Sequence, residues 1–320
     1  MDRRRFLLSA AAPLVLGAVP ALGARRGGTP LALVTADLEG AVVAVHITTG
    51  RVLRRLVTPA DPRSIESLAG TAALVAHTAS GRLTLIDGPS LALEEIAGTF
   101  EAPRYTAARP DGRVAYVSDS SREEVVVVDV RRRRAVARLR VGGPARHLSL
   151  SPSGRRLWVS LGTKADRIAI VALDEPLRPR LVTSFRPPFL AHDVGFAPNG
   201  REVWVTSGDR GRVAVYDARG GLVRSLAADA PPQHVSFLGG RAFVTSGDDA
   251  ILRVHRRSDG RLLRSTALPV GSYNVQQGFG VVLTPSLSQG TLCVVSESGA
   301  VVERRRVARS SHDACFVMSR

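Results

Sequence analysis

Short runs of alternating apolar and polar residues follow one another along most of the chain, and Gly, Pro, Asp and Ser separate them. A period of two residues, carried by Val, Ile and Leu, is typical of β-strands. After the first 24 residues, no stretch sustains a helical period of useful length. The pattern therefore predicts an all-β fold built from many short strands.

One kind of strand, small and apolar and ending in a polar turn, recurs at intervals of about 40 residues. Its seven copies are LVTAD at Leu33, LVAHT at Leu74, YVSDS at Tyr116, WVSLG at Trp158, WVTSG at Trp204, FVTSG at Phe243 and VLTPS at Val282. Several copies follow a Pro-x-Gly turn, and further strand-like runs come after each copy. Four antiparallel strands per copy, repeated radially, predict a seven-bladed β-propeller, in which few sheet edges are exposed.

The two ends of the repeat region fit one ring. The region begins at Leu31 with what corresponds to the second strand of a copy, so the first strand is missing there. The last segment, HDACFVM from His312, matches the first-strand segment that begins at His192. We therefore expect residues 31–320 to form one propeller, with the C-terminal strand completing the first blade.

The first 24 residues have the layout of an export signal. Arg3, Arg4 and Arg5 precede an apolar run that starts at Phe6, and small residues follow it. The arginines with Phe6 and Leu7 resemble the twin-arginine motif, and an ordinary Sec signal is the alternative. We expect export, signal cleavage and no stable membrane span, with residues 25–30 as a short linker.

The repeat motifs together resemble the YVTN or YncE-like family of seven-bladed propellers. The resemblance rests on Pro-Asp-Gly turns, on WVT or YVS strands and on V-x-V-x-D third strands, and it covers essentially the whole chain after the signal. Members of that family include binding proteins, sugar-lactone hydrolases, antibiotic-ring lyases and haem-dependent enzymes. The resemblance thus implies the fold and leaves the activity open.

Charge and cysteine content narrow the choice of partners. The formal net charge is +16, and the arginines that supply it recur at turn after turn. They lack the interleaved aromatic residues of proteins that bind single-stranded nucleic acid. We therefore interpret them as solvated surface and do not expect nucleic acid as a partner. Only Cys293 and Cys315 are present, too few for a disulfide framework, and whether they pair is left open. We expect a monomer.

Histidine and other polar side chains recur where the first strand of each copy begins, which in a propeller surrounds the central funnel. The candidate ligand-binding residues at the funnel mouth are Tyr105, His147, His192, Asp193, His234, Asn274, His312 and Asp313. Neighbouring imidazoles could bind a transition metal, with His192, His234 and His312 as the candidate ligands. A His with an Asp could act as general acid and base. The recurrence could also be architectural, with each His bonded to a neighbouring blade.

Several function classes remain. The main hypothesis is an exported binding or scaffold protein that holds a small molecule or a protein at the funnel. The alternatives are a lactonase-like hydrolase or streptogramin-lyase-like enzyme using His and Asp at the same mouth, and a propeller that holds a metal or haem-type cofactor. No C-x-x-C-H motif accompanies the last option, and the sequence indicates no particular cofactor.

Overall fold

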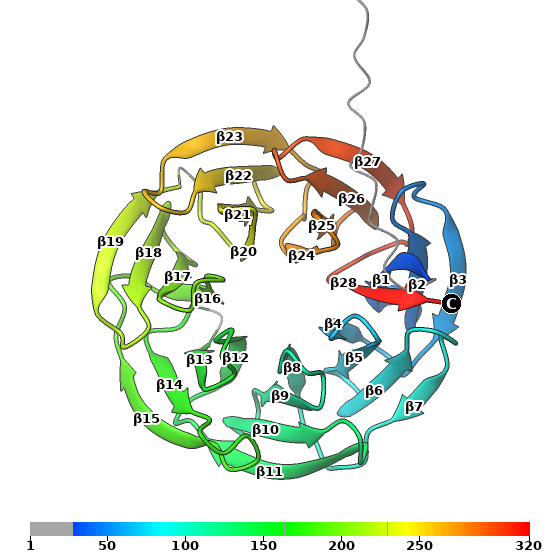
Figure 1. Cartoon of the computed structure of the whole chain (residues 1–320), viewed down its shortest axis with the longest axis horizontal. Coiled ribbons are helices and arrows are strands. Elements are labelled where there is room, and N and C mark those ends of the chain that lie inside the picture. Colours follow the sequence, from blue (N-terminus) through cyan, green and yellow to red (C-terminus); the bar gives the residue numbers. More distant parts are fainter. Residues whose placement is uncertain (1–27, 163, 229) are drawn as a thin grey trace, which may run out of the picture.

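The chain forms a ring of seven β-sheets around a central axis (Figure 1). The computed structural model describes residues 28–162, 164–228 and 230–320. Each sheet has four antiparallel strands, so the predicted all-β, seven-bladed propeller is confirmed. The predicted signal in residues 1–24 lies outside the described residues. In the described part of the chain we find no helix with the length and apolar character that a membrane span requires.

The first four blades, given from the inner strand outward, use the following segments. Blade 1 contains β28 (Ala314–Ser319), β1 (Thr29–Ala36), β2 (Ala41–His46) and β3 (Val52–Val57). Blade 2 contains β4 (Pro62–Leu68), β5 (Ala72–His77), β6 (Arg82–Asp87) and β7 (Leu93–Glu95). Blade 3 contains β8 (Pro103–Ala108), β9 (Val114–Asp119), β10 (Glu124–Asp129) and β11 (Arg134–Arg140). Blade 4 contains β12 (Ala145–Leu150), β13 (Arg156–Leu161), β14 (Ile168–Ala172) and β15 (Arg180–Phe185).

The remaining three blades have the same order. Blade 5 contains β16 (Ala191–Phe196), β17 (Glu202–Ser207), β18 (Arg212–Asp217) and β19 (Leu222–Ala227). Blade 6 contains β20 (Val235–Leu238), β21 (Arg241–Ser246), β22 (Ile251–Arg256) and β23 (Leu262–Ala267). Blade 7 contains β24 (Gln276–Gly278), β25 (Val281–Pro285), β26 (Thr291–Ser296) and β27 (Val301–Arg306). One 3-10 turn, η1 (Asp37–Glu39), joins β1 to β2.

The ring closes as the sequence predicted. The C-terminal strand β28 pairs antiparallel with β1, with Leu33 opposite Cys315 and Thr29 opposite Ser319. In Figure 1 the red C-terminal strand lies beside the blue N-terminal strands of the same blade. Since blade 1 takes its strands from both ends of the chain, the ring is completed only when the two ends meet.

The core lies between neighbouring blades. The second and third strands of a blade are covered on both faces, and residues 125–128 of β10, all Val, are fully buried. Outer strands such as β3 are largely exposed. Trp158 shows how two blades join, because its buried ring from blade 4 packs edge-on to Phe196 of blade 5 at 6.1 Å between centroids. Trp204 has the same place one blade later.

Candidate functional site

The starts of the inner strands meet near the axis, and all eight candidate residues lie on these strands or within two residues before them. They come from six of the seven blades: Tyr105, His147, His192, Asp193, His234, Asn274, His312 and Asp313. Seven of these side chains are buried, and only His192 is part-exposed. The structure thus places them inside the ring rather than on an open mouth, as a closely packed polar group.

A bulge at the start of the inner strand is repeated in blades 2 to 5. The register with the second strand shifts between Pro62 and Ser64, Pro103 and Thr106, Ala145 and Leu148, and Ala191 and Val194. A bulge breaks the strict alternation of side chains and redirects them. In blades 4 and 5 this irregularity turns His147 and His192 toward the axis.

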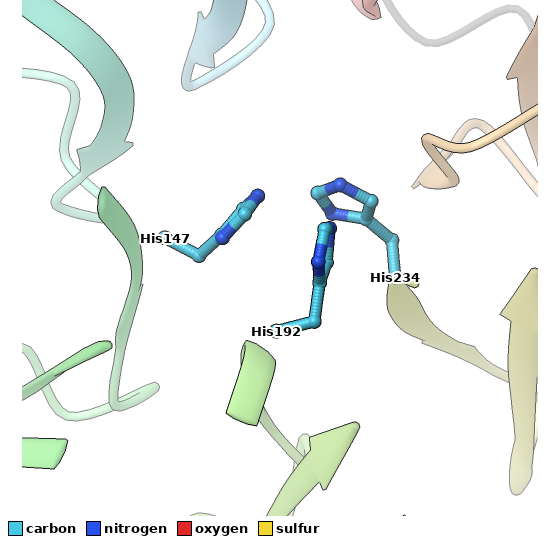
Figure 2. A group of neighbouring side chains, drawn as sticks. All are labelled: His147, His192 and His234. Atoms are coloured by element: carbon cyan, nitrogen blue, oxygen red, sulfur yellow. The ribbon is translucent and has the colours of Figure 1, made fainter. Parts of the chain in front are cut away.

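Three histidines from consecutive blades face one another (Figure 2). The ring centroids of His147 and His192 are 4.6 Å apart, and those of His147 and His234 are 4.7 Å apart. Each residue can offer one nitrogen such that all three nitrogens lie within 4.8 Å of one another. We call this set the histidine cluster.

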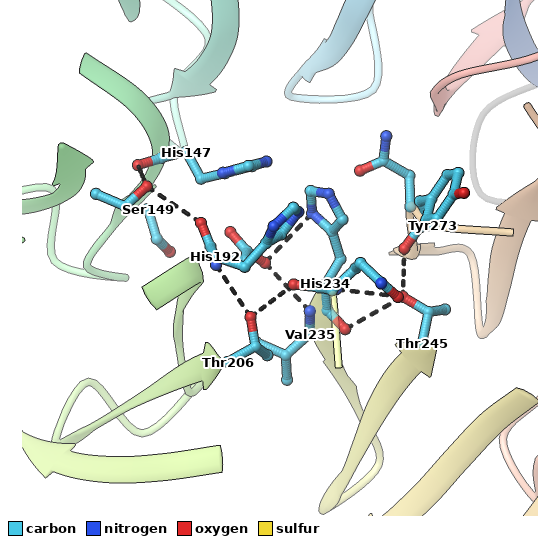
Figure 3. A network of polar contacts seen from close by, with 12 residues as sticks. His147, Ser149, His192, Thr206, His234, Val235, Thr245 and Tyr273 are labelled. Atoms are coloured by element: carbon cyan, nitrogen blue, oxygen red, sulfur yellow. Dashed lines mark hydrogen bonds and ion pairs between the residues drawn. The ribbon is translucent and has the colours of Figure 1, made fainter. Parts of the chain in front are cut away.

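The Asp193 carboxylate joins the histidine cluster to the backbone through His234 and Val235, which are both labelled in Figure 3. Its Oδ2 lies 3.4 Å from Nδ1 of His234 and accepts a hydrogen bond from the Val235 N–H at 3.2 Å. A carboxylate beside Nδ1 favours the tautomer that carries the proton on Nδ1. Nε2 of His234 is then the nitrogen with a free lone pair.

His312 belongs to a different arrangement. Asn274 donates a hydrogen bond from Nδ2 to the His312 carbonyl at 2.7 Å, and the same Nδ2 lies 3.3 Å from Nδ1 of His312. The ring of His312 is 6.3 Å from that of Tyr105. Of the three metal ligands proposed from the sequence, the structure groups His192 and His234 with His147 instead of with His312. The blade order is the reason, because blades 4, 5 and 6 are consecutive and blade 1 is not next to them.

Burial keeps the imidazoles of His147 and His312 neutral. It lowers the pKa of His147 well below the usual value, and His192, His234 and Arg146 lower it further. Burial likewise lowers the pKa of His312, with a smaller contribution from Arg63. Neutral imidazole can accept a proton or bind a metal, whereas imidazolium can do neither.

A pair of carboxyl groups occupies the opposite side of the ring. Burial raises the pKa of Asp313 to about 6, although the backbone N–H groups of Ile65 and Ala314 donate to it at 3.1 and 2.9 Å. Burial and the neighbouring Asp313 raise the pKa of Glu66 to about 8. Glu66 is part-exposed, but its open side faces the space that the inner strands surround. The two groups therefore differ in protonation at neutral pH.

A cavity of about 290 Å³ runs along the inner strands, and we call it the central cavity. All seven blades line it. Its polar lining includes Ser64, Glu66, Tyr105, His147, Asp193, His234, Asn274, Gln276 and Asp313. Six of the eight candidate residues are among them, while His192 and His312 are not. The volume is near the lower limit for small-molecule pockets, which is roughly 300 Å³.

Arginine occupies one equivalent position in three consecutive blades, as Arg63, Arg104 and Arg146. Arg146 lies over the Tyr105 ring, with its Cζ 6.0 Å from the centroid. Burial lowers the pKa of Arg104, and Arg146 and Arg63 lower it further, so the three positive charges are close enough to repel. The side of the buried polar group that blades 2 to 4 form is therefore electropositive.

Sequence reasoning missed Glu66 and Arg63. The first strand of blade 2 has neither His nor Tyr at its start, so it lacks the residue types that mark the equivalent position in most other blades. Ser64 and Glu66 are alternate polar residues on either side of the apolar Ile65, and this alternation was a usable signal. Alternate residues share one face of a strand, and here that face lines the central cavity.

Several proteins of known structure have the same fold as this chain. No protein-family model matches the chain, and no curated protein matches it. A functionally unknown protein from Desulfotomaculum acetoxidans is 12% identical, with a TM-score of 0.78 over 91% of this chain and 99% of its own. A candidate 6-phosphogluconolactonase from Bacteroides fragilis is 12% identical, with a TM-score of 0.73 over 91% and 98%. The periplasmic gluconolactonase PpgL of Pseudomonas aeruginosa is 20% identical, with a TM-score of 0.69 over 90% and 99%. These similarities support the seven-bladed fold.

Proposed function

We propose that the central cavity binds a small sugar-type lactone and that the protein hydrolyses it. The observation that carries this proposal is that two carboxyl groups, Asp313 and Glu66, line the central cavity, where burial raises the pKa of Asp313 to about 6 and that of Glu66 to about 8. Two titratable groups whose environments separate their pKa values are the usual basis of an acid and base assignment. At neutral pH Asp313 is mostly ionised and Glu66 mostly protonated.

The two groups take complementary roles in the proposed reaction. Asp313 accepts a proton from a water molecule, whose oxygen attacks the lactone carbonyl carbon. Glu66 donates a hydrogen bond to the carbonyl oxygen, where negative charge develops. The ring C–O bond then breaks, and the ring oxygen takes the proton that Asp313 received. Water is consumed, one hydroxy acid is formed, and both carboxyl groups return to their starting states.

Two further observations support a ligand of this kind. The cavity has the volume of a small pocket and a polar lining, which suits a hydroxyl-rich molecule. Two proteins of the same fold are described as a gluconolactonase and a candidate 6-phosphogluconolactonase. We also propose, from the repeat motifs, that the chain is YncE-like, and from residues 1–24 that it is exported.

A non-catalytic binding protein is the second candidate. The observation that favours it is the engagement of the cavity carboxylates by backbone, since Asp313 accepts from Ile65 and Ala314, and Asp193 accepts from Val235. Groups held in this way form a rigid recognition site. Such a protein would bind the lactone or its hydroxy acid, or a protein partner, without turnover.

The test is hydrolysis of glucono-1,5-lactone and 6-phosphogluconolactone by the purified protein, measured above the spontaneous rate. We expect Asp313→Asn to lower kcat by about 10²- to 10⁴-fold, and Glu66→Gln to lower it as well. The asparagine amide oxygen can accept the Ile65 N–H, but its NH2 group would then face the Ala314 N–H, so thermal unfolding of the variant is compared with that of wild type. Asp111→Asn, in an exposed turn, is the matched control and should leave the rate unchanged.

The outcome also separates the two candidates. Binding of gluconate or the lactone, seen by calorimetry, with turnover no faster than the spontaneous rate would establish the binding protein instead. Turnover that persists in both carboxyl variants would exclude the assignment of Asp313 and Glu66.

A further inference from the structure

The histidine cluster has a donor set that the proposed hydrolysis does not use. The geometry points to a site in which His147, His192 and His234 bind one divalent transition-metal ion of the Zn²⁺ or Cu²⁺ type. Imidazole nitrogen is a preferred ligand of both ions. Three nitrogens within 4.8 Å of one another are close to the spacing of about 3.3 Å in a tetrahedral zinc site, and side-chain rotation can supply the difference.

His147 supplies the first independent support. Both of its ring nitrogens are buried, and neither has a hydrogen-bond partner among the described residues. Buried polar groups normally have a partner, and an exception calls for an unseen ion or water. Buried His77 and His255 differ in this respect, because Nε2 of His77 contacts Thr84 at 2.9 Å and Nδ1 of His255 contacts the Gly260 carbonyl at 3.0 Å.

Asp193 supplies the second independent support for a metal site. Metal-binding histidines usually donate their other ring N–H to a carboxylate or carbonyl, which fixes the tautomer and ring orientation. The contact between Asp193 Oδ2 and His234 Nδ1 at 3.4 Å has this form. It leaves Nε2 of His234 for the metal. Because Val235 anchors the same carboxylate oxygen, the arrangement is already oriented.

Charge around the cluster sets the conditions for binding. Asp193 contributes a favourable negative charge at the cluster, while Arg146 is near enough to oppose a cation. Zn²⁺ and Cu²⁺ are intermediate between hard and soft ions and form strong bonds to nitrogen, so they suit this mixture of one negative and one positive neighbour. Ca²⁺ and Mg²⁺ suit it less well, because they require several oxygen ligands.

Three protein ligands leave a fourth position open. His147 and His234 both line the central cavity, so the open position can be reached from it. This is the arrangement of zinc sites that bind an exogenous ligand, whereas structural zinc sites are closed by four protein ligands. Metal binding here does not depend on lactone hydrolysis, and either can hold if the other fails.

The test is metal binding by the full chain after chelator treatment. We expect one Zn²⁺ or Co²⁺ per chain in equilibrium dialysis with elemental analysis, and visible Co²⁺ absorption typical of a four-coordinate site. His147→Ala, His192→Ala and His234→Ala should each abolish stoichiometric uptake. Asp193→Asn should weaken affinity by about 10- to 100-fold, which a merely structural contact would not do.

A matched histidine variant is the control. His46→Ala, at the end of β2, should retain one ion per chain. His192 is the part-exposed member, so His192→Ala is the variant least expected to affect folding, and its thermal unfolding should be compared with the metal-free wild type. Wild-type protein that takes up no ion, or uptake equal in wild type and His192→Ala, would overturn the inference.

Discussion

The Thr206 hydroxyl donates a hydrogen bond to the carbonyl of Gln233, in the next blade, at 2.6 Å. The same oxygen accepts a hydrogen bond from the N–H of Asp193, at the bulge of its own blade, at 3.0 Å. Thr245 repeats the arrangement with His234 and Tyr273 (Figure 3). The hydroxyl at the third position of the WVT and FVT motifs therefore fixes the starts of two inner strands at once.

Removal of that hydroxyl should destabilise the ring. We expect Thr206→Val to lower the free energy of unfolding by about 1–3 kcal/mol, because the buried Asp193 N–H and Gln233 carbonyl lose their partner without a change in side-chain shape. Chemical denaturation of wild type and variant measures the difference.

The chain contains a matched control at the equivalent place in blade 7. Thr284 is fully buried, and among the described residues its Oγ1 has no hydrogen-bond partner other than a weak contact with the Cys293 thiol of its own blade. Thr284→Val should therefore be close to neutral, since no hydrogen bond between blades is lost. Equal losses at the two positions would show that the inter-blade hydrogen bonds are not the cause.

Stability should depend on pH through Glu66. Its pKa rises from 4.5 to about 8 on folding, so between these values the unfolded chain releases a proton that the folded chain keeps. Stability from this group is complete below pH 4.5 and is lost as pH rises toward 8. Glu66→Gln should therefore gain stability relative to wild type by at most about 1.4 kcal/mol per pH unit in this window.

Denaturation at several pH values measures that gain. Glu175→Gln, at an exposed position, is the control and should show no pH-dependent difference from wild type. A constant difference between wild type and Glu66→Gln from pH 4.5 to 8 would contradict the raised pKa.

The two thiols should be inert until the protein unfolds. Cys293 and Cys315 are free, buried and in different packing clusters. Burial raises the pKa of both, so little reactive thiolate forms near neutral pH. A thiol reagent should label neither residue in the native protein and both in denaturant. Absence of labelling in denaturant without a reductant would instead reveal a disulfide.

Ring closure should depend on the packing of β28. Phe316 is buried, and its ring meets Phe279 of blade 7 edge-on, with centroids 5.6 Å apart. Phe316→Ala should cost about 3–5 kcal/mol, measured by denaturation. Met318→Ala in the same strand, where the side chain is part-exposed, should cost clearly less. A similar cost for both variants would argue against a specific role for the contact between the two phenylalanines.

The repeat pattern by itself determined the architecture. Seven similar strands at nearly regular spacing, each bounded by turn residues, can bury their apolar faces only against one another. The match between the segments at His192 and His312 also predicted that the C-terminal strand completes blade 1, and the pairing of β28 with β1 confirms it. These features are local and periodic, so they can be recognised without coordinates.

Only the tertiary structure decided how the polar residues are grouped. The sequence placed His147, His192, His234 and His312 at equivalent strand starts, but the order of the blades and the bulges in blades 4 and 5 bring the first three together and leave His312 with Asn274. Glu66 gains its raised pKa from surroundings contributed by other blades, which no local pattern contains. Side-chain direction at a bulge and burial at the axis both arise from contacts between distant segments, and such contacts exist only after the ring has closed.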